Sequence, residues 1–163
     1  MRGTILVTGS LGLIGVGLSQ RLTRLGWNII GLDMRGSPAL DRDVRNATDT
    51  ISQLDLSGII HLAAVSRVID GEANPRLCRS VNVDGTRAVV AGALSVSSRP
   101  WLIYASSREV YGQQSSLPVD AILSPINVYA RSKVDAESVM RGGRQAGLKT
   151  VVLRFFECFR KHL

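Results

Sequence analysis

The sequence predicts an α/β fold, a doubly wound parallel sheet with helices on both faces. Short apolar runs of strand length alternate along the chain with longer segments in which apolar residues recur at helical spacing. The first run passes directly into a helical segment through a turn with glycines at positions 9, 12 and 15. At 163 residues the chain is long enough for one domain with a core of its own.

The strands are predicted from apolar runs bounded by turn residues. They fall at residues 5–7, 27–33, 58–64, 101–105 and 149–155, with a short additional strand at 41–44. Only nine residues separate Asp33 from Asp43, so the connection between these two strands is too short for a full crossover helix.

The helices are predicted from apolar residues three and four positions apart. They fall at residues 11–25, 46–54, 77–97 and 129–145. In the first helix one face is formed by Leu11, Ile14, Leu18, Leu22 and Leu25. Gly26 follows as a C-terminal stop. Gly142 and Gly143 weaken the last helix, since glycine costs about 1 kcal/mol relative to alanine in a helix interior.

Composition excludes several classes of protein. The net charge is +7, but the basic residues are scattered and aromatic residues make up only 5%, which disfavours nucleic-acid binding and favours attraction of a small anionic ligand. No apolar run reaches the length of a membrane span, and Met1 to Gly3 leave no room for a signal peptide. Cys78 and Cys158 have no metal-ligand spacing, so we expect a cytoplasmic protein without a metal site.

The opening turn predicts a dinucleotide site. A helix start leaves backbone N–H groups free for a phosphate, and glycines at positions 9, 12 and 15 allow close approach. Asp33 ends the next strand 18 residues after Gly15, where a carboxylate accepts hydrogen bonds from the ribose hydroxyls and favours NAD over NADP. Two alternatives stay open: Asp33 is an ordinary surface acid, or Arg35 accommodates the 2′-phosphate of NADP.

Residues after later strands complete this expected site. Asp43 and Val44 lie where an adenine edge is met, and the strand at 58–64 ends in small residues that leave space for a cofactor. His61 in that strand is either a ligand or base, or a packed side chain, and packing is favoured.

A proton-transfer site is predicted from Tyr129 and Lys133, which lie one helical turn apart on one face. An ammonium beside a phenol stabilises phenolate and lowers the phenol pKa from about 10, which makes Tyr129 a usable base. A serine at the end of the strand 101–105 would orient a substrate hydroxyl in the same crevice.

Together these features resemble the extended short-chain dehydrogenase/reductase family, in particular its nucleotide-sugar epimerase/dehydratase group. The matching motifs, which span nearly the whole chain, are Thr8-Gly9-x-x-Gly12-x-x-Gly15, Asp33, Asp43-Val44, His61-Leu62-Ala63-Ala64, Val81-Asn82-Val83-Asp84-Gly85-Thr86, Ser106-Ser107-x-x-Val110-Tyr111-Gly112 and Tyr129-x-x-x-Lys133.

The resemblance implies an NAD-binding Rossmann domain over residues 1–155 that transfers hydride from a sugar carbon to NAD. Tyr129 is then the base, Lys133 binds the nicotinamide ribose and tunes Tyr129, and Ser107 positions the reacting hydroxyl. The residues expected to contact NAD are Gly9, Leu11, Gly12, Leu13, Ile14, Gly15, Asp33, Met34, Asp43, Val44, Leu62, Ala63, Ala64, Asn82, Tyr129 and Lys133.

The subclass depends on the segment Ser107-Arg108-Glu109. Members resembling 4,6-dehydratases carry Thr-Asp-Glu here, so Arg108 in place of the aspartate disfavours dehydration. Glu109 then acts as an acid or base in an epimerase or decarboxylase, or it pairs with a neighbouring arginine.

The resemblance stops at the C-terminal end. Family members run to about twice this length, and their second half supplies most of the sugar-nucleotide pocket. Here Phe156 begins a short basic tail, residues 156–163, so the family's substrate domain is expected to be absent. A premature stop, a frameshifted gene end or an excised domain would each give this sequence.

Three functions therefore compete. The first is an NAD-dependent epimerase-type enzyme acting on a nucleotide sugar, impaired by the missing half. The second is an NAD-binding sensor or inactive remnant without turnover, and the third, suggested by charge alone, is a nucleic-acid binder. The family commonly dimerises through the helices at 77–97 and 129–145, and Phe155, Phe156 and Phe159 would be exposed by the truncation. We expect a homodimer.

Overall fold

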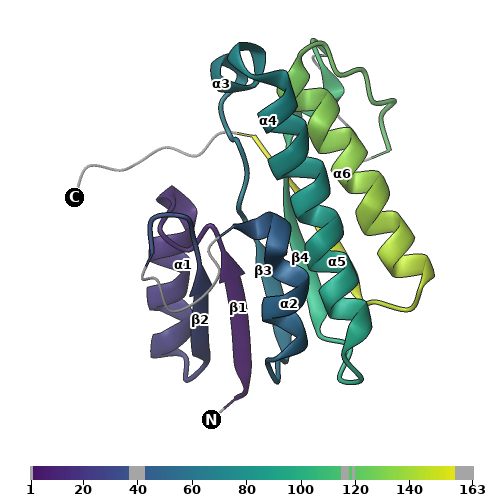
Figure 1. Ribbon diagram of the computed structural model, residues 1–163. Helices are drawn as coiled ribbons and strands as arrows, with labels where there is room; N and C mark the ends of the chain where they lie inside the picture. The colour runs from purple at the N-terminus through teal and green to yellow at the C-terminus, as the bar shows by residue number, and fades with distance from the viewer. Residues whose placement is uncertain (1, 37–42, 115–117, 119, 157–163) are drawn as a thin grey trace.

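The computed structural model describes residues 2–36, 43–114, 118 and 120–156. In these ranges five parallel strands form one sheet, in the order β2-β1-β3-β4-β5. The strands are β1 (Thr4–Thr8), β2 (Asn28–Leu32), β3 (Gly58–His61), β4 (Trp101–Ser107) and β5 (Thr150–Phe155). The chain crosses over after β1–β2 to place β3 on the other side of β1, and this reversal creates a crevice at the carboxyl ends of the strands (Figure 1).

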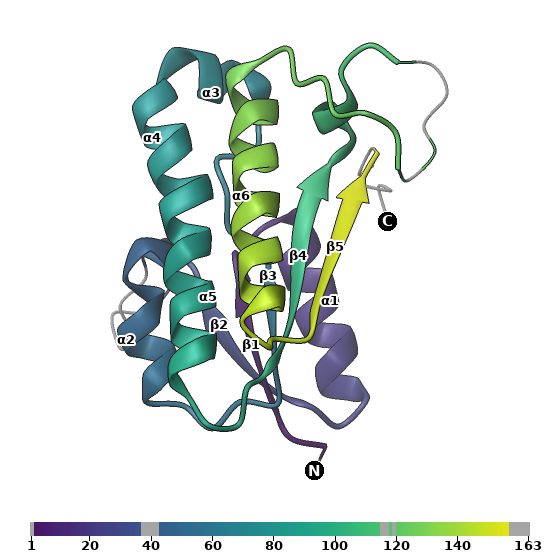
Figure 2. The same cartoon turned by 90° about the vertical axis from the view of Figure 1, so that its right-hand side faces the viewer.

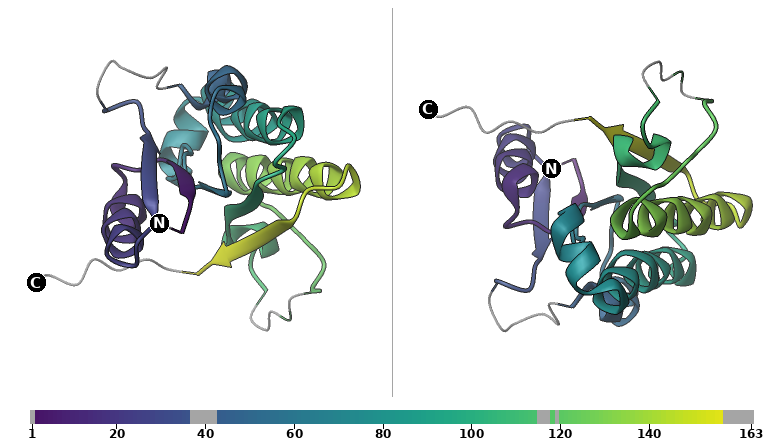
Figure 3. Two further views of the ribbon diagram at one scale, coloured as in Figure 1. Left: turned by 90° about the horizontal axis from the view of Figure 1, so that it is seen from below. Right: turned by 90° about the horizontal axis from the view of Figure 1, so that it is seen from above.

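The α-helices are α1 (Leu13–Arg24), α2 (Ala47–Ser52), α3 (Val68–Ala73), α4 (Pro75–Arg79), α5 (Gly85–Ser95) and α6 (Val128–Gln145). Figure 3 shows α1 on one face of the sheet and α2, α5 and α6 on the other. The predicted doubly wound sheet with helices on both faces is therefore confirmed, although the two faces are covered unequally.

Each face has its own apolar core. The larger core packs buried strand residues such as Leu6, Ile59 and Leu102 against the side with α2, α5 and α6, where Ile51 and Met140 are fully buried. Figure 2 shows α5 and α6 side by side on this face. The smaller core joins buried residues of β1 and β3 to α1. On this second face β5 stays open, with Val151 50% and Leu153 43% exposed.

The predicted short strand at 41–44 is wrong for the residues that the structure describes. Asp43 instead caps a 3₁₀ turn, η1 (Val44–Asn46), and its carboxylate accepts a hydrogen bond from the backbone N–H of Arg45. Aspartate favours such local caps over strand pairing. Residues 41 and 42 lie outside the described ranges.

The predicted helix at 77–97 is one rod with an interruption. It starts at Pro75, with the Asn74 side chain accepting from the N–H of Leu77, and continues as α4. A π-helical turn, η2 (Ser80–Asp84), then leads into α5. Such a turn holds one more residue than an α-helical turn.

Two short elements had no sequence prediction. Helix α3 follows β3, and a 3₁₀ turn, η3 (Arg108–Tyr111), follows β4. Both lie at the carboxyl edge of the sheet, above the crevice. No helix in the described part of the chain is long and apolar enough to cross a membrane.

Candidate active site

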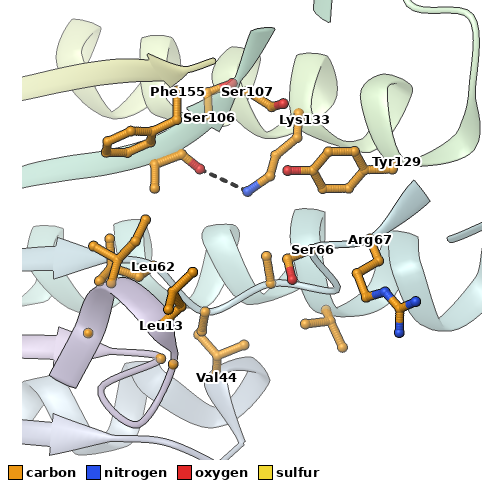
Figure 4. A pocket seen from close by; sticks show the side chains of 18 of the residues that line it. Leu13, Val44, Leu62, Ser66, Arg67, Ser106, Ser107, Tyr129, Lys133 and Phe155 are labelled. Atoms are coloured by element: carbon orange, nitrogen blue, oxygen red, sulfur yellow. Dashed lines mark hydrogen bonds between the residues drawn. The ribbon is translucent and has the colours of Figure 1, made fainter. Parts of the chain in front are cut away.

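A cavity of about 840 Å³ lies along the carboxyl edge of the sheet, with residues from near the ends of all five strands in its wall. Sixteen of the predicted site residues line it: Gly9, Gly12, Leu13, Ile14, Gly15, Asp33, Met34, Asp43, Val44, Leu62, Ala63, Ala64, Ser107, Glu109, Tyr129 and Lys133. The structure thus brings together both halves of the expected site, the glycine turn and the tyrosine–lysine pair, in one space (Figure 4).

The turn between β1 and α1, at one end of the cavity, requires residues without a Cβ at two positions. Gly9 has φ +69°, and a Cβ there would lie 2.8 Å from the backbone nitrogen of Ala63. A Cβ on Gly15 would lie 2.3 Å from the carbonyl oxygen of Gly9. Only glycine at these two positions lets α1 start directly above the end of β1, with its first N–H groups toward the cavity. A helix start of this kind offers free backbone N–H groups to an anionic group such as a pyrophosphate.

Asp33 lies beside this turn with its side chain 7% exposed. Its carboxylate accepts hydrogen bonds from the Nε, Nη2 and backbone N–H groups of Arg35, and from the backbone N–H of Leu11. Burial alone would raise the pKa of Asp33, but the hydrogen bonds from Arg35 and Leu11 outweigh it and lower that pKa. Asp33 is therefore held in its ionised form, the form that accepts hydrogen bonds from ribose hydroxyls. In this structure both of its carboxylate oxygens accept hydrogen bonds from the Arg35 guanidinium.

Leu11 contributes to the site through its backbone. Its side chain is 44% exposed and lies outside the cavity wall, while its N–H fixes the Asp33 carboxylate. Leu11 was predicted to contact NAD, but it is not among the residues that line the cavity.

A chain of hydrogen bonds beneath the cavity fixes His61. The Thr86 hydroxyl donates to the carbonyl of Asn82, so it accepts from Nε2 of His61 at 3.0 Å. Nδ1 of His61 then accepts from the Thr8 hydroxyl at 2.7 Å. Since burial lowers the pKa of His61 to about 3, its imidazole is neutral at physiological pH. The favoured interpretation of His61 as a packed side chain agrees with this geometry.

Asn82 is also structural. It is 1% exposed and lies outside the cavity wall. Its Oδ1 accepts from the backbone N–H of Val65, and its Nδ2 donates to the Val65 carbonyl and to Oγ of Ser132. Asn82 thereby holds the segment after β3 against α6, and its expected contact with NAD stays a prediction.

The reactive end of the cavity is formed by α6 and β4. Asn127 caps α6, which places Tyr129 and Lys133 in its first two turns. Lys133 Nζ donates to the carbonyl of Ala105 at 2.8 Å and lies 5.8 Å from the centre of the Tyr129 ring. In Figure 4 the hydroxyl end of Tyr129 is directed toward Lys133. Burial lowers the pKa of Lys133 to about 8.

Ser107 and Glu109 stand at the end of β4 on the same wall. The Ser107 hydroxyl accepts from the backbone N–H of Glu109 at 3.2 Å, which starts the turn η3. The Glu109 carboxylate accepts from Nδ2 of Asn127 at 3.1 Å. Among the described residues no arginine forms an ion pair with Glu109, so the alternative of an Arg–Glu pair is not supported there.

Arg35, named above as a possible contact of a 2′-phosphate, also lines the wall. The wall residues that were not predicted as site residues are Leu32, Ser66, Arg67, Val68, Val81, Ala105, Ser106, Phe155 and Phe156. Ser66 and Arg67 follow the small residues after β3, in a loop without periodicity, so no sequence signal identified them. Ala105 and Ser106 adjoin the predicted Ser107 and could have been inferred from a longer β4. Figure 4 shows Ser66 and Arg67 across the cavity from Tyr129, toward the end away from Leu13.

Comparison with known proteins agrees with this geometry. The model of the NAD dependent epimerase/dehydratase family matches residues 5–162. The chain belongs to this family. The Arabidopsis thaliana UDP-glucuronate 4-epimerase 4 is 28% identical over 96% of this chain and 42% of its own length. The Streptomyces lividans UDP-glucose 4-epimerase is 28% identical over 96% of this chain and 52% of its own.

A solved structure of UDP-glucose 4-epimerase from Brucella ovis, in complex with NAD, is similar with a TM-score of 0.83 and 27% identity. The similarity covers 94% of this chain and 51% of that protein. The chain thus spans about half the length of the relatives it matches. The chain shares its family and its fold with these epimerases.

Proposed function

We propose that this chain binds NAD and provides the hydride-transfer site of a nucleotide-sugar epimerase-type oxidoreductase. The observation that carries the proposal is the joint placement of the glycine turn, Asp33 and the Tyr129–Lys133 pair around one cavity. NAD, when bound, accepts hydride from a sugar carbon. The names of the relatives support UDP-glucose and UDP-glucuronate as the first sugars to try.

The residues of the chain have separate tasks in this proposal. Tyr129 takes the proton of the reacting hydroxyl, and the charge of Lys133 favours the phenolate that does so. Ser107 orients the hydroxyl from the end of β4. Glu109 is a second acid or base on the same wall, held by Asn127. The turn that precedes α1 binds the pyrophosphate and the Asp33 carboxylate binds the ribose.

The Asp33 carboxylate already accepts hydrogen bonds from Arg35, so a ribose has to compete with Arg35 for it. Both oxygens of Asp33 are bonded to Arg35, whose side chain is 64% exposed. Binding of NAD therefore requires Arg35 to give up at least one of these hydrogen bonds. An exposed arginine can do so at small cost, because water replaces the lost contact. NADP remains the second choice of cofactor, since its 2′-phosphate would meet the same Arg35.

A second candidate function is NAD binding without turnover. It is supported by the lining of the cavity, since the glycine turn and Asp33 can bind the cofactor whether or not a substrate is held about 3–3.5 Å from the acceptor carbon. The sixteen wall residues that were predicted belong to the cofactor side of the reaction or to its acid–base groups. The expected division into a domain at 1–155 and a tail at 156–163, the homodimer and the cytoplasmic location stay predictions.

The test combines binding and turnover. Isothermal titration calorimetry with NAD should show binding by the wild type and by Tyr129→Phe with similar affinity, because the variant loses only the phenol hydroxyl. Conversion of UDP-glucose and UDP-glucuronate to their 4-epimers, a reaction in which NAD takes up the hydride and returns it, should fall by at least about 10²-fold in Tyr129→Phe, the typical contribution of a general base. NAD binding with neither epimer formation nor reduction of the bound NAD in the wild type would support the second candidate, and absence of NAD binding by folded protein would refute both.

A further inference from the structure

A buried ion pair lies directly behind the reactive wall of the cavity. Glu137 of α6 has a side chain that is 4% exposed, and Arg154 of β5 one that is 21% exposed. Nε of Arg154 donates to one carboxylate oxygen at 2.9 Å and Nη2 donates to the other at 2.7 Å. The pair is bidentate and joins the edge strand to the helix that carries Tyr129 and Lys133.

The same carboxylate also fixes the end of β4. The Ser106 hydroxyl donates to Oε1 of Glu137 at 2.6 Å. The preceding residue, Ala105, accepts from Lys133 Nζ through its carbonyl. Since Lys133 and Glu137 are four residues apart, they share one face of α6 and clamp two neighbouring residues of β4. The next residue along β4 is Ser107, so its position relative to Tyr129 depends on this clamp.

Arg154 extends the cluster to the turn above the cavity. Its Nη1 donates to the Tyr111 hydroxyl at 2.7 Å, and its guanidinium lies 4.9 Å from the centre of the Tyr111 ring. Tyr111 closes the turn η3, which carries Glu109. One buried carboxylate thereby connects the elements that hold Ser107, Glu109 and Lys133.

Stability alone is a weak explanation for this arrangement. Burying an ion pair costs desolvation energy that the pair itself often fails to recover, and an apolar pair of similar volume is frequently as stable. Because Glu137 lies one helical turn from the buried Lys133, its negative charge also acts on the ammonium group of that lysine. We propose that Glu137 is a positioning residue that fixes the end of β4 and supplies a counter-charge for Lys133 on the same face of α6. This inference rests on the role proposed above for Lys133 beside Tyr129.

The groups that face Lys133 come from every element around it. They are His61 of β3, Cys78 of α4, Tyr104 of β4, Tyr129 and Glu137 of α6 and, through Glu137, Arg154 of β5. Burial lowers the pKa of Lys133 to about 8, while the negative charges of Cys78, in its thiolate form, and of Glu137 act to raise it. His61 is neutral and offers no counter-charge. Loss of the Glu137 charge therefore lowers the pKa of Lys133 further, and the loss of Arg154 raises it.

The sequence makes this measurable without turnover, because it contains only three lysines, Lys133, Lys149 and Lys161. In protein labelled with ¹³C at lysine Cε, the chemical shift of each lysine can be followed by NMR as the pH is changed, and Lys133→Arg assigns the Lys133 signal. We expect a wild-type midpoint near 8 for Lys133, a lower midpoint in Glu137→Gln and a higher one in Arg154→Gln. Opposite shifts from two substitutions that both break the same ion pair identify an effect of charge.

Asp135→Asn is the matched control. It removes one carboxylate from the same helix two residues earlier, but the Asp135 side chain is 47% exposed and pairs with Arg79 on the outer side. Its Lys133 midpoint should equal that of the wild type. A purely structural ion pair would lower the free energy of unfolding in Glu137→Gln and leave the Lys133 midpoint unchanged, and that result would overturn the inference.

Folding is checked first by circular dichroism. If Glu137→Gln does not fold, Arg154→Gln decides alone, and an unchanged or lowered midpoint in that variant contradicts the proposal. NAD binding measured by calorimetry on the same samples keeps the two questions apart. A shifted Lys133 midpoint in protein that does not bind NAD would refute the proposed function and leave the coupling between Glu137 and Lys133 standing.

Discussion

His61 shows how a single residue in the sequence motif can be structural. Both ring nitrogens are satisfied by threonine hydroxyls, and the backbone N–H groups of Leu62 and Ala63 donate to the same Thr8 oxygen. The imidazole therefore orders the strand end that forms the floor of the cavity, without reaching the cavity itself. A charged imidazole would lose one of these bonds, because both nitrogens would then be donors.

This arrangement predicts a stability that depends on pH. The pKa of His61 falls from 6.5 in the unfolded chain to about 3 in the folded one. Between these values the unfolded state binds more protons, so the His61 contribution is complete above about pH 6.5 and is lost as the pH falls toward 3. The slope approaches about 1.4 kcal/mol per pH unit for one proton. Urea denaturation at several pH values should show this slope for the wild type and a flatter curve for His61→Gln, and identical curves would contradict the assignment.

At the scale of elements, the first helix offers a sharp test of the glycine turn. Gly15→Ala places a Cβ 2.3 Å from the Gly9 carbonyl, so the turn must open; we expect destabilisation of about 1–3 kcal/mol and loss of NAD binding. Gly17 lies two residues later in α1, and a Cβ there meets nothing within 4 Å. Gly17→Ala should therefore stabilise the helix by up to about 1 kcal/mol and preserve NAD binding.

Thermal denaturation and calorimetry on the two variants measure these effects. Equal NAD affinity in Gly15→Ala and Gly17→Ala would show that the turn is not the phosphate site. The comparison separates the close approach of the backbone from the general cost of glycine in a helix, because both substitutions make the same chemical change in the same helix.

The elements with strong periodicity were predictable from the sequence. The five strands of the sheet and the helix from Val128 were expected, since apolar runs and helical spacing report burial directly. The strand at 41–44 was a wrong prediction because Asp43 bonds its own backbone neighbour, a local choice that a short segment does not reveal. Helix α3 was missed because its six residues, of which only Gly71 is buried, give no apolar face.

The candidate site divides in the same way. Residues in the glycine turn and in the first turns of α6 were predictable, because spacing along a turn or helix fixes which side chains converge. The position of Asn82 in its motif predicted a contact with the cofactor. In the structure its side chain forms hydrogen bonds with Val65 and Ser132, which are distant in sequence. Such tertiary contacts, like those of Glu137, leave no signal in a single sequence.

For the whole molecule, the unequal covering of the sheet has a measurable result. Val151, Leu153 and Phe156 are each at least 43% exposed and lie on the last strand or next to it, whereas Phe159 lies outside the described residues. Exposed apolar side chains on an edge strand favour association. We expect light scattering to give about twice the chain mass of 17.6 kDa. A measured mass equal to that of one chain at micromolar concentration would contradict the predicted homodimer.

A charge in this surface should weaken the association. Leu153→Lys places an ammonium in the centre of the open β5 face, while Ile122→Lys makes the same change at an 84% exposed residue in the loop before α6. A lower mass in Leu153→Lys alone would assign the contact to β5. Equal masses in both variants and the wild type would leave the other predicted surface, the helical segments at 77–97 and 129–145, as the candidate contact.

The π-helical turn at Ser80–Asp84 fixes the rotation of α4 about the helix axis relative to α5. Removing one residue there would restore regular winding and rotate everything before it by about 100°. Cys78, fully buried next to Ser132, would swing toward water, and an exposed neighbour would take its place against α6. The length of this stretch is consequently as constrained as its composition: a single-codon deletion at Ser80–Asp84 should damage the fold more than any conservative replacement within it.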